Sequence, residues 1–390
     1  RDPDGKQLAF GKVSGPEWLV VAGNGGLSGL PVPANLGENT FRVFARNDAK
    51  QAEATVIVTV LRDDPITDSL GVDDAVPGAP AENIWVVDNS WCGTGNSPIV
   101  NGLRSSIRTY FSLLDQAEVE HVGAYLSSDA RTYDGRPLRD PTGTMLFFWK
   151  DTNLVEYFVH RLLAPHYGYC YSSPIWATYR FQQRVPNEWP FYKKDFVRDR
   201  VPQDVLIATI HPDYFGYYTR GRPEQRWTAD DFAGAFLAFA EREKQSFRVS
   251  VVAPQCKSLA SSEREAVEGL AASRNEVVPV PVAAPSAYSR LVDRTKGEFL
   301  ALNCQVDYNA VMRRYAQQVI FRAYVHAKQR IALSKKPLDP ADIEVRVGGR
   351  ILDRSLWRYD ASSNAIEIDW LRIDVSALKP GDRIEIRYRA

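Results

Sequence analysis

Asp88 and Ser90 stand two residues apart at the end of an apolar run, Ile84–Val87, and before a turn that contains Gly93 and Gly95. A carboxylate and a hydroxyl are hard oxygen ligands, the kind that Mg²⁺ and Ca²⁺ prefer in proteins. An apolar strand that ends in Asp-x-Ser, with a helix behind it, could offer both side chains to a divalent cation. The same residues could instead cap the helix, because Asp and Ser are preferred N-cap residues.

His211 and Asp213 form a second pair that could do chemistry, as an acid-base pair in a hydrolase. The other histidines are scattered through the sequence, at His121, His160, His166 and His326. None of the five belongs to a His-Glu-x-x-His motif, and no Gly-x-Ser-x-Gly motif occurs. His211 and Asp213 are more simply explained as loop residues, so we expect a protein that is not an enzyme.

The segment 146–227 is rich in aromatic residues. Clustered rings beside Arg and Asn on loops would suit a surface that binds a protein or a glycan. The same rings could instead pack the core, where aromatic residues are also common. The candidates for a binding surface are the rings that follow Asp213, namely Tyr214, Phe215, Tyr217 and Tyr218.

Residues 83–330 alternate between short apolar runs and amphipathic stretches, which predicts a parallel sheet with helices on both faces. Thr228, followed by Asp231, is a plausible N-cap of one helix. Ligands of such sheets bind at the carboxyl ends of the strands, which is where Asp88 and Ser90 fall. The predicted strands are 84–87, 119–126, 205–210, 248–253, 276–280 and 299–302, and the predicted helices are 103–114, 229–244, 262–272, 286–296 and 308–326.

The two ends of the chain have strand patterns without helices. Residues 1–62 and residues 336–390 contain short apolar runs divided by turn signals such as Asn24-Gly25-Gly26 and Gly348-Gly349. Residues 63–82 are rich in Pro, Gly and Asp without periodicity, which is typical of a linker. The sequence therefore predicts a multidomain protein. Its parts are an N-terminal all-β sandwich (1–62), a linker (63–82), a central doubly wound α/β domain (83–335) and a small C-terminal β extension (336–390).

Composition excludes several classes of partner. Lys and Arg number 48, as do Asp and Glu, so no net charge attracts nucleic acid or an anionic membrane. No run approaches the roughly 18 apolar residues that span a bilayer. The N-terminus, Arg1–Gly5, resembles neither a signal peptide nor a natural start, so we expect a mature or excised fragment. The four cysteines (Cys92, Cys170, Cys256 and Cys304) form no Cys-x-x-Cys motif and would be buried thiols or disulfides of an exported protein.

The residues from 83 onward resemble bacterial exported proteins of the von Willebrand factor A (vWA) type. The resemblance rests on Asp88-Asn-Ser-Trp-Cys92, on Val119–Asp129, on Asp195–Arg200 followed by the run at 205–210, and on the Ile343–Gly349 and Ile384–Tyr388 segments. It implies a Rossmann-type sheet whose metal site binds partner proteins. It also implies a disulfide between Cys256 and Cys304, with Cys92 and Cys170 as a further candidate pair.

The resemblance implies a metal site with five positions, not all of which are matched. Asp88 and Ser90 match, whereas Cys92 stands where the family has Ser, and a thiolate is a soft ligand that Mg²⁺ and Ca²⁺ do not favour. The late acid of the family would be Asp213, shifted by about one place. The hydroxyl of the second loop has four candidates: Ser172, Ser173, Thr142 and Thr144. The site is therefore a degenerate one, for Mg²⁺ or Ca²⁺ if a metal binds.

The first 60 residues resemble a dystroglycan-type cadherin-like, or Ig-like, module of bacterial surface proteins. The matching segments are Asp2–Leu8, Ser14–Leu19, Gly26–Pro31 and Asn39–Val43. In that family a strand precedes the first of these segments, so we expect an open sheet edge or one that a neighbouring module fills.

These observations favour a non-enzymatic surface or adhesion protein, located outside the cell or in the periplasm. It would bind a protein or glycan on a cell surface, or a neighbouring envelope protein, through the loop face of a vWA-like domain. One alternative is a structural spacer in an envelope or fibre assembly. Another is a hydrolase centred on His211 and Asp213.

Overall fold

The structure is a computed structural model of the chain. It describes residues 7–60, 64–87, 98–128, 135–137, 147–148, 173–188, 198, 200–209, 227–254, 284–302 and 307–390. Two compact units are present: one consists of Arg1–Thr67, Lys335–Glu344 and Ile386–Ala390, and the other of Asp68–Ser334 and Val345–Glu385.

The N-terminal β-rich region has a three-stranded antiparallel sheet in the order β1-β4-β5 and a separate hairpin, β2–β3. Its core is thin, because Leu19 and Phe41 are the buried hydrophobic residues among the described positions 7–60. The Trp18 ring packs edge-on against Phe41, with ring centroids 5.2 Å apart. The elements are β1 (Ala9–Ser14), β2 (Leu19–Val21), β3 (Leu27–Gly29), η1 (Pro33–Asn35), β4 (Gly37–Arg46) and β5 (Gln51–Val60).

The second unit contains the predicted parallel sheet, which is confirmed. Its strand order is β12-β11-β10-β7-β8-β9, and only the short edge strand β9 runs antiparallel to its neighbour among these strands. The strands are β7 (Pro80–Val87), β8 (Glu120–Ser127), β9 (Phe147–Phe148), β10 (Pro202–Ala208), β11 (Ser246–Pro254) and β12 (Phe299–Leu302).

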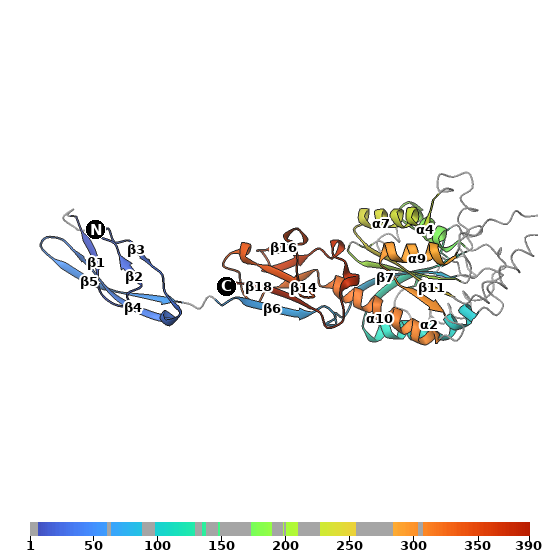
Figure 1. Cartoon of the computed structure of the whole chain (residues 1–390), viewed down its shortest axis with the longest axis horizontal. Helices are drawn as coiled ribbons and strands as arrows, with labels where there is room; N and C mark the ends of the chain where they lie inside the picture. Colours follow the sequence, from blue (N-terminus) through green and yellow to red (C-terminus); the bar gives the residue numbers. More distant parts are fainter. Residues whose placement is uncertain are drawn as a thin grey trace, which may run out of the picture. The chain divides into compact units, whose positions relative to one another are not determined.

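Helices cover both faces of this sheet (Figure 1). α2 (Pro98–Gln116) and α10 (Tyr308–Ala327) pack on one face, and α4 (Pro174–Glu188), α7 (Ala229–Arg242) and α9 (Ala284–Thr295) on the other. Because side chains alternate across a strand, Trp85 faces α2 and α10, whereas Ile84 and Val86 face the other three helices. Both faces of β7 are therefore apolar, as expected for a buried parallel strand.

Two smaller sheets complete the described structure, with strand orders β13-β17-β16 and β15-β14-β18-β6. The core residues of the first sheet include Ile331, Trp357 and Ile366, all buried. The elements are β6 (Ile66–Gly71), β13 (Arg330–Ala332), η4 (Pro340–Asp342), β14 (Glu344–Val347), β15 (Arg350–Ile351), η5 (Arg354–Leu356), β16 (Trp357–Asp360), β17 (Ala365–Ile368), η6 (Trp370–Arg372), η7 (Val375–Ala377) and β18 (Arg383–Tyr388).

Several elements differ from the sequence prediction. β6 lies inside the stretch 63–82 that was predicted to be a linker, and β7 begins within it, at Pro80. The polar residues Thr67, Asp68 and Ser69 conceal the alternation of β6 in the sequence. α4 was not predicted at all, and the helix and strand predicted at 262–272 and 276–280 lie outside the described residues. The domain boundaries stay a prediction.

Candidate functional site

The sheet reverses its direction of winding between β7 and β10. From β7 the chain moves to β8 on one side, and it later returns to β10 on the other side of β7. At such a switch point the two following loops leave in opposite directions and open a crevice at the carboxyl ends of the strands. Val87 and Ala208 are register partners there, so β7 and β10 end at the same level of the sheet. This edge is the candidate functional site.

Hydroxyl residues line the neighbouring strand ends. The backbone N–H of Ser128, just beyond β8, donates to Val87 O at 3.1 Å, and the N–H of Ser173 donates to Ser128 O at 2.8 Å. Beyond β10, the Thr209 N–H donates to Val252 O at 3.1 Å. Ser128, Ser173 and Thr209 are all buried. Three segments that are far apart in sequence therefore place hydroxyl-bearing residues at one edge of the sheet.

Packing of α4 explains why Ser173 lies at this edge. Ser173 directly precedes α4, whose Trp176 and Phe181 are buried in the core between the sheet and the helices. Gly135 has a φ of +75°, and a Cβ there would lie 2.7 Å from Ala177 O. A larger residue would push the loop after β8 away from the helix. The rings of Trp176 and Phe181 thus belong to the core, one of the two roles considered for the aromatic segment.

The candidate metal-ligand, acid-base, partner-binding and cysteine residues lie outside the described structure, with one exception. The exception is Ser173, one of the four candidates for a hydroxyl ligand, which lies at the carboxyl edge of the sheet. Within the described residues no group of three or more His, Cys, Asp and Glu side chains could hold a metal. Outside the described residues lie Asp88, Ser90, Asp213, His211, Tyr214, Phe215, Tyr217, Tyr218, Cys92, Cys170, Cys256, Cys304, Ser172, Thr142 and Thr144.

The sequence reasoning missed Ser128 and Thr209 as residues of this edge. A signal for Ser128 was present, because Ser127 and Ser128 directly follow the apolar run at 119–126. Thr209 lay inside the predicted strand 205–210, whereas β10 ends at Ala208. The alternation rule alone does not locate the end of an apolar strand, because both faces are buried.

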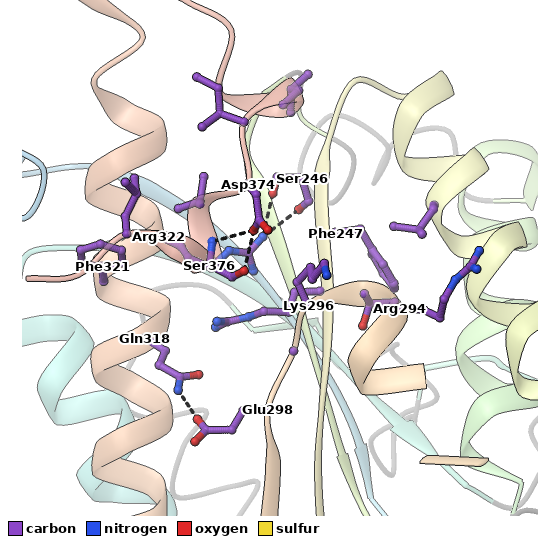
Figure 2. A pocket seen from close by; sticks show the side chains of 18 of the residues that line it. Ser246, Phe247, Arg294, Lys296, Glu298, Gln318, Phe321, Arg322, Asp374 and Ser376 are labelled. Atoms are coloured by element: carbon purple, nitrogen blue, oxygen red, sulfur yellow. Dashed lines mark hydrogen bonds between the residues drawn. The ribbon is translucent and has the colours of Figure 1, made fainter. Parts of the chain in front are cut away.

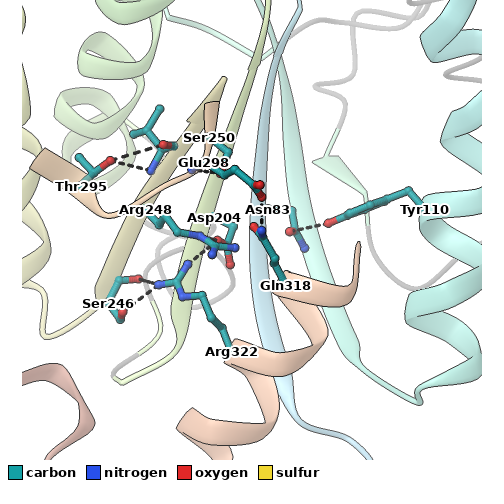
Figure 3. Close-up of polar contacts among 11 residues, drawn as sticks. Asn83, Tyr110, Asp204, Ser246, Arg248, Ser250, Thr295, Glu298, Gln318 and Arg322 are labelled. Carbon is teal, nitrogen blue, oxygen red and sulfur yellow. Dashed lines mark hydrogen bonds and ion pairs between the residues drawn. The ribbon is translucent and has the colours of Figure 1, made fainter. Parts of the chain in front are cut away.

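A buried ion cluster lies on the sheet face that α10 covers (Figure 3). Asp204 of β10 is the register partner of Arg248 of β11, and Arg248 Nε donates to Asp204 Oδ1 at 2.8 Å. Arg322 of α10 donates to the same oxygen and, through Nη2, to Ser246 Oγ at 2.8 Å. The three charged side chains are buried, so this cluster ties α10 to both strands.

Other titratable groups near the cluster are held in their neutral forms. Burial, together with the charge of Arg322, lowers the pKa of His326 to about 3. Burial likewise raises the pKa of Tyr110 well above its ordinary value, and its hydroxyl donates to Asn83 Oδ1 at 2.7 Å.

Glu82 is the centre of a second buried cluster, on the opposite sheet face. Its carboxylate accepts from Arg198 N at 2.9 Å and Nε at 3.2 Å, from Gln245 Nε2 at 2.6 Å and from Gln203 Nε2 at 3.2 Å. Burial nevertheless raises the pKa of Glu82 to about 7, against the lowering effect of Arg198 and Gln245. Both clusters lie toward the amino ends of the strands, away from the candidate site.

No family model and no curated protein matches this chain. A pilus adhesin, SpaC from Lactobacillus rhamnosus GG in its open conformation, is similar over 100% of this chain and 43% of its own, with 9% identity and a TM-score of 0.33. This chain thus spans less than half the length of that adhesin.

A second solved structure is that of the conserved hypothetical protein BatB from Bacteroides thetaiotaomicron. It is similar over 61% of this chain and 97% of its own, with 12% identity and a TM-score of 0.30. Within the described residues, no helix combines the length and the apolar character needed to cross a bilayer. The candidate site is therefore defined by its own residues and by the register of its strands.

Proposed function

We propose that this chain is a non-enzymatic, exported surface protein that binds a protein or glycan partner through the carboxyl edge of its parallel sheet. One observation carries the proposal: Val87 and Ala208 are register partners at the switch point. Adjacent parallel strands lie about 4.8 Å apart, so the loops that begin after them start side by side. Those loops hold Asp88 and Ser90 in one case and Asp213 in the other.

A divalent cation is the ligand that these side chains would suit. Asp88, Ser90 and Asp213 would supply carboxylate and hydroxyl oxygens, and Ser173, a further hydroxyl-bearing residue, lies at the same edge. Cys92 does not fit this donor set, because its thiolate is soft. Mg²⁺ or Ca²⁺, when bound, would accept a carboxylate of the partner as its remaining ligand, as the resemblance to vWA domains implies.

Aromatic rings would supply the other part of the binding surface. Tyr214, Phe215, Tyr217 and Tyr218 follow β10 on the loop beside Asp213. Tyr and Phe bury a large area at a small entropic cost, which makes them frequent anchors at interfaces. A flat ring also suits the apolar face of a sugar. Both ligand classes, protein and glycan, therefore fit this loop.

Titration with Mg²⁺, Mn²⁺ and Ca²⁺ tests the metal site, with heat and melting temperature as the readouts. A ligand that binds only the folded state adds about 2.7 kcal/mol of stability at a hundredfold excess over its dissociation constant. We expect this shift in the wild type and its loss in Asp88→Ala. Asp293→Ala, an exposed aspartate on α9, is the matched control and should behave as the wild type. Equal shifts in both variants would exclude Asp88 as a ligand.

Binding to a glycan array and to an array of immobilised surface proteins tests the loop. We expect Tyr214→Ala together with Tyr217→Ala to weaken binding at least tenfold, because two anchors are removed. Retention of full affinity would exclude these rings as anchors. Tight, metal-independent self-association without any bound partner would instead favour the spacer alternative.

A further inference from the structure

A cavity of about 670 Å³ lies at the amino-terminal end of the sheet, beside the first residues of β11 (Figure 2). β12 pairs only with the last part of β11, from Val251 to Pro254, so no strand follows at the outer edge of Ser246–Ser250 among the described residues. α10, the turn between α9 and β12, and the segment 371–380 form the walls instead. The cavity is distinct from the candidate site, which lies at the opposite ends of the strands.

The turn between α9 and β12 is held tightly against β11. A Cβ on Gly297 would lie 1.7 Å from Val249 O, so only glycine allows this approach. Thr295 Oγ1 accepts from the Val249 N–H at 3.0 Å, and the Val251 N–H donates to Glu298 O at 2.9 Å. These contacts replace a neighbouring strand at this edge. They also set Arg294 and Lys296 at the rim of the cavity.

The lining of the cavity is strongly basic, although the whole chain has no net charge. Glu298 and Asp374 are the two acidic residues of the lining. The six basic ones are Arg248, Arg294, Lys296, Arg314, Arg322 and Arg372. This excess of four positive charges is a local property, and it would attract an anion.

Some of these charges are neutralised by partners and others are not. Asp204, which lies behind the cavity, pairs with both Arg248 and Arg322, and Glu298 pairs with Arg314. Arg294 and Lys296 are exposed and form no ion pair with the described residues. Arg372, also exposed, donates to Ser355 O at 2.9 Å. Arg294 and Lys296 therefore remain for a ligand.

The inner surface of the cavity is partly apolar. Phe247 of β11 is buried, Phe321 of α10 is half-buried, and both line the cavity together with Ile373 and Leu378. Figure 2 shows Phe247 and Phe321 on opposite sides of Lys296. A volume of about 670 Å³ is in the range of pockets that hold small organic molecules.

We propose that this cavity binds a small organic anion, with a phosphate or carboxylate group at the rim that holds Arg294 and Lys296 and an apolar body against Phe247 and Phe321. The charge of the rim selects the anionic group, and the rings select the apolar body. The proposal does not depend on the proposed adhesion function, because no residue of the cavity belongs to the carboxyl edge of the sheet.

Isothermal titration of the full chain at low ionic strength tests this proposal, with four probes. Phenyl phosphate and benzoate carry both an anion and a ring, inorganic phosphate lacks the ring, and benzyl alcohol lacks the charge. We expect phenyl phosphate or benzoate to bind. The probe that binds more tightly shows whether the cavity prefers a phosphate or a carboxylate group. Inorganic phosphate should bind at least tenfold more weakly, and benzyl alcohol should not bind. Binding by neither of the two ring-bearing anions would overturn the proposal.

Matched variants separate the site from general charge effects. Arg294→Gln with Lys296→Gln should weaken binding of the preferred probe at least tenfold. Arg290→Gln with Arg313→Gln removes the same charge from exposed positions of α9 and α10 that do not line the cavity, and it should change the affinity by less than twofold. Melting curves of both variants check that the fold is retained. If both double variants lost the same affinity for the probe, the cavity would not be a defined anion site. The same conclusion would follow if benzyl alcohol bound as tightly as the anions.

Discussion

At the scale of single residues, Asp204 is the carboxylate on which two buried guanidinium groups depend. Arg248 and Arg322 both donate to its Oδ1, and all three residues are less than a tenth exposed. Burying charges is costly unless they are paired. We therefore expect Asp204→Asn, which keeps the shape and removes the charge, to lower the free energy of unfolding by about 3–5 kcal/mol.

Urea unfolding monitored by circular dichroism measures this loss. The urea concentration at the midpoint should fall, and the dependence of the free energy of unfolding on urea should not change. Asp293→Asn, an exposed residue of α9, is the control and should have an effect close to zero. A loss below 1 kcal/mol in Asp204→Asn would mean that the two arginines find other partners or water.

Glu82 gives the protein a pH-dependent stability. Its pKa is about 7 in the folded protein, above the ordinary value of 4.5, so the folded state binds a proton that the unfolded state releases. The contribution of the protonated Glu82 to the free energy of unfolding is complete below pH 4.5 and is lost as the pH rises through 7. From these values the loss between pH 5 and pH 8 is roughly 3 kcal/mol.

Glu82→Gln should remove this dependence, whereas Glu241→Gln, an exposed residue of α7, should retain it. The measurement is the free energy of unfolding at pH 5, 6, 7 and 8. An unchanged pH profile in Glu82→Gln would show that the four donors around the carboxylate outweigh the effect of burial.

At the scale of the elements, α10 connects the sheet to the segments that follow it. Arg322, in the last third of α10, donates to Asp204 of the ion cluster. Lys328, just beyond the end of α10, donates to Val72 O at 3.0 Å and to Asp74 O at 2.6 Å. The Trp370 indole N–H donates to Lys328 O at 3.0 Å. This helix therefore orders residues on both sides of it in sequence, including the segment that forms a wall of the cavity.

Two glycines allow a matched test of how the helices meet the sheet. Gly297 lies against Val249 O, where backbone atoms leave no space for a Cβ, whereas a Cβ on Gly234 of α7 would meet no atom within 4 Å. We expect Gly297→Ala to cost about 1–3 kcal/mol through overpacking. Gly234→Ala should instead stabilise the protein by about 0.5–1 kcal/mol, because alanine favours a helix.

Thermal melting of the two variants checks the opposite signs. If Gly297→Ala melted at the wild-type temperature, the α9–β12 turn would have to move freely. In that case the rim of the cavity would not be a fixed structure.

At the scale of the whole molecule, the two units differ in the size of their cores. The described residues 7–60 bury Leu19 and Phe41, whereas the sheet of the second unit has large apolar clusters on both faces. A small core gives low stability. We expect two calorimetric transitions, the first from the N-terminal unit.

Phe41→Ala should abolish the first transition and leave the second unchanged. Truncation of a buried Phe costs about 3–5 kcal/mol, which is a large part of the stability of a small domain. A single transition in the wild type would indicate that the units unfold together.

The sequence by itself determined the local elements. Short continuous apolar runs predicted β7, β8, β10, β11 and β12 within a few residues, because a strand buried on both faces is apolar throughout. The capping pair Thr228 and Asp231 is confirmed, with the Thr228 side chain accepting from the Asp231 N–H. β6 was not predicted, because polar residues interrupt its apolar pattern. α4 was not predicted, because its aromatic residues could have belonged either to a binding surface or to the core.

Only the tertiary structure decided which distant residues are neighbours. The sequence shows where an apolar run ends, but the pairing of Val87 with Ala208 depends on the strand order. The sharing of Asp204 by Arg248 and Arg322, and the basic cavity at the edge of β11, arise in the same way. Local periodicity reflects the burial of each segment on its own, whereas such contacts come from the packing of segments far apart in the chain.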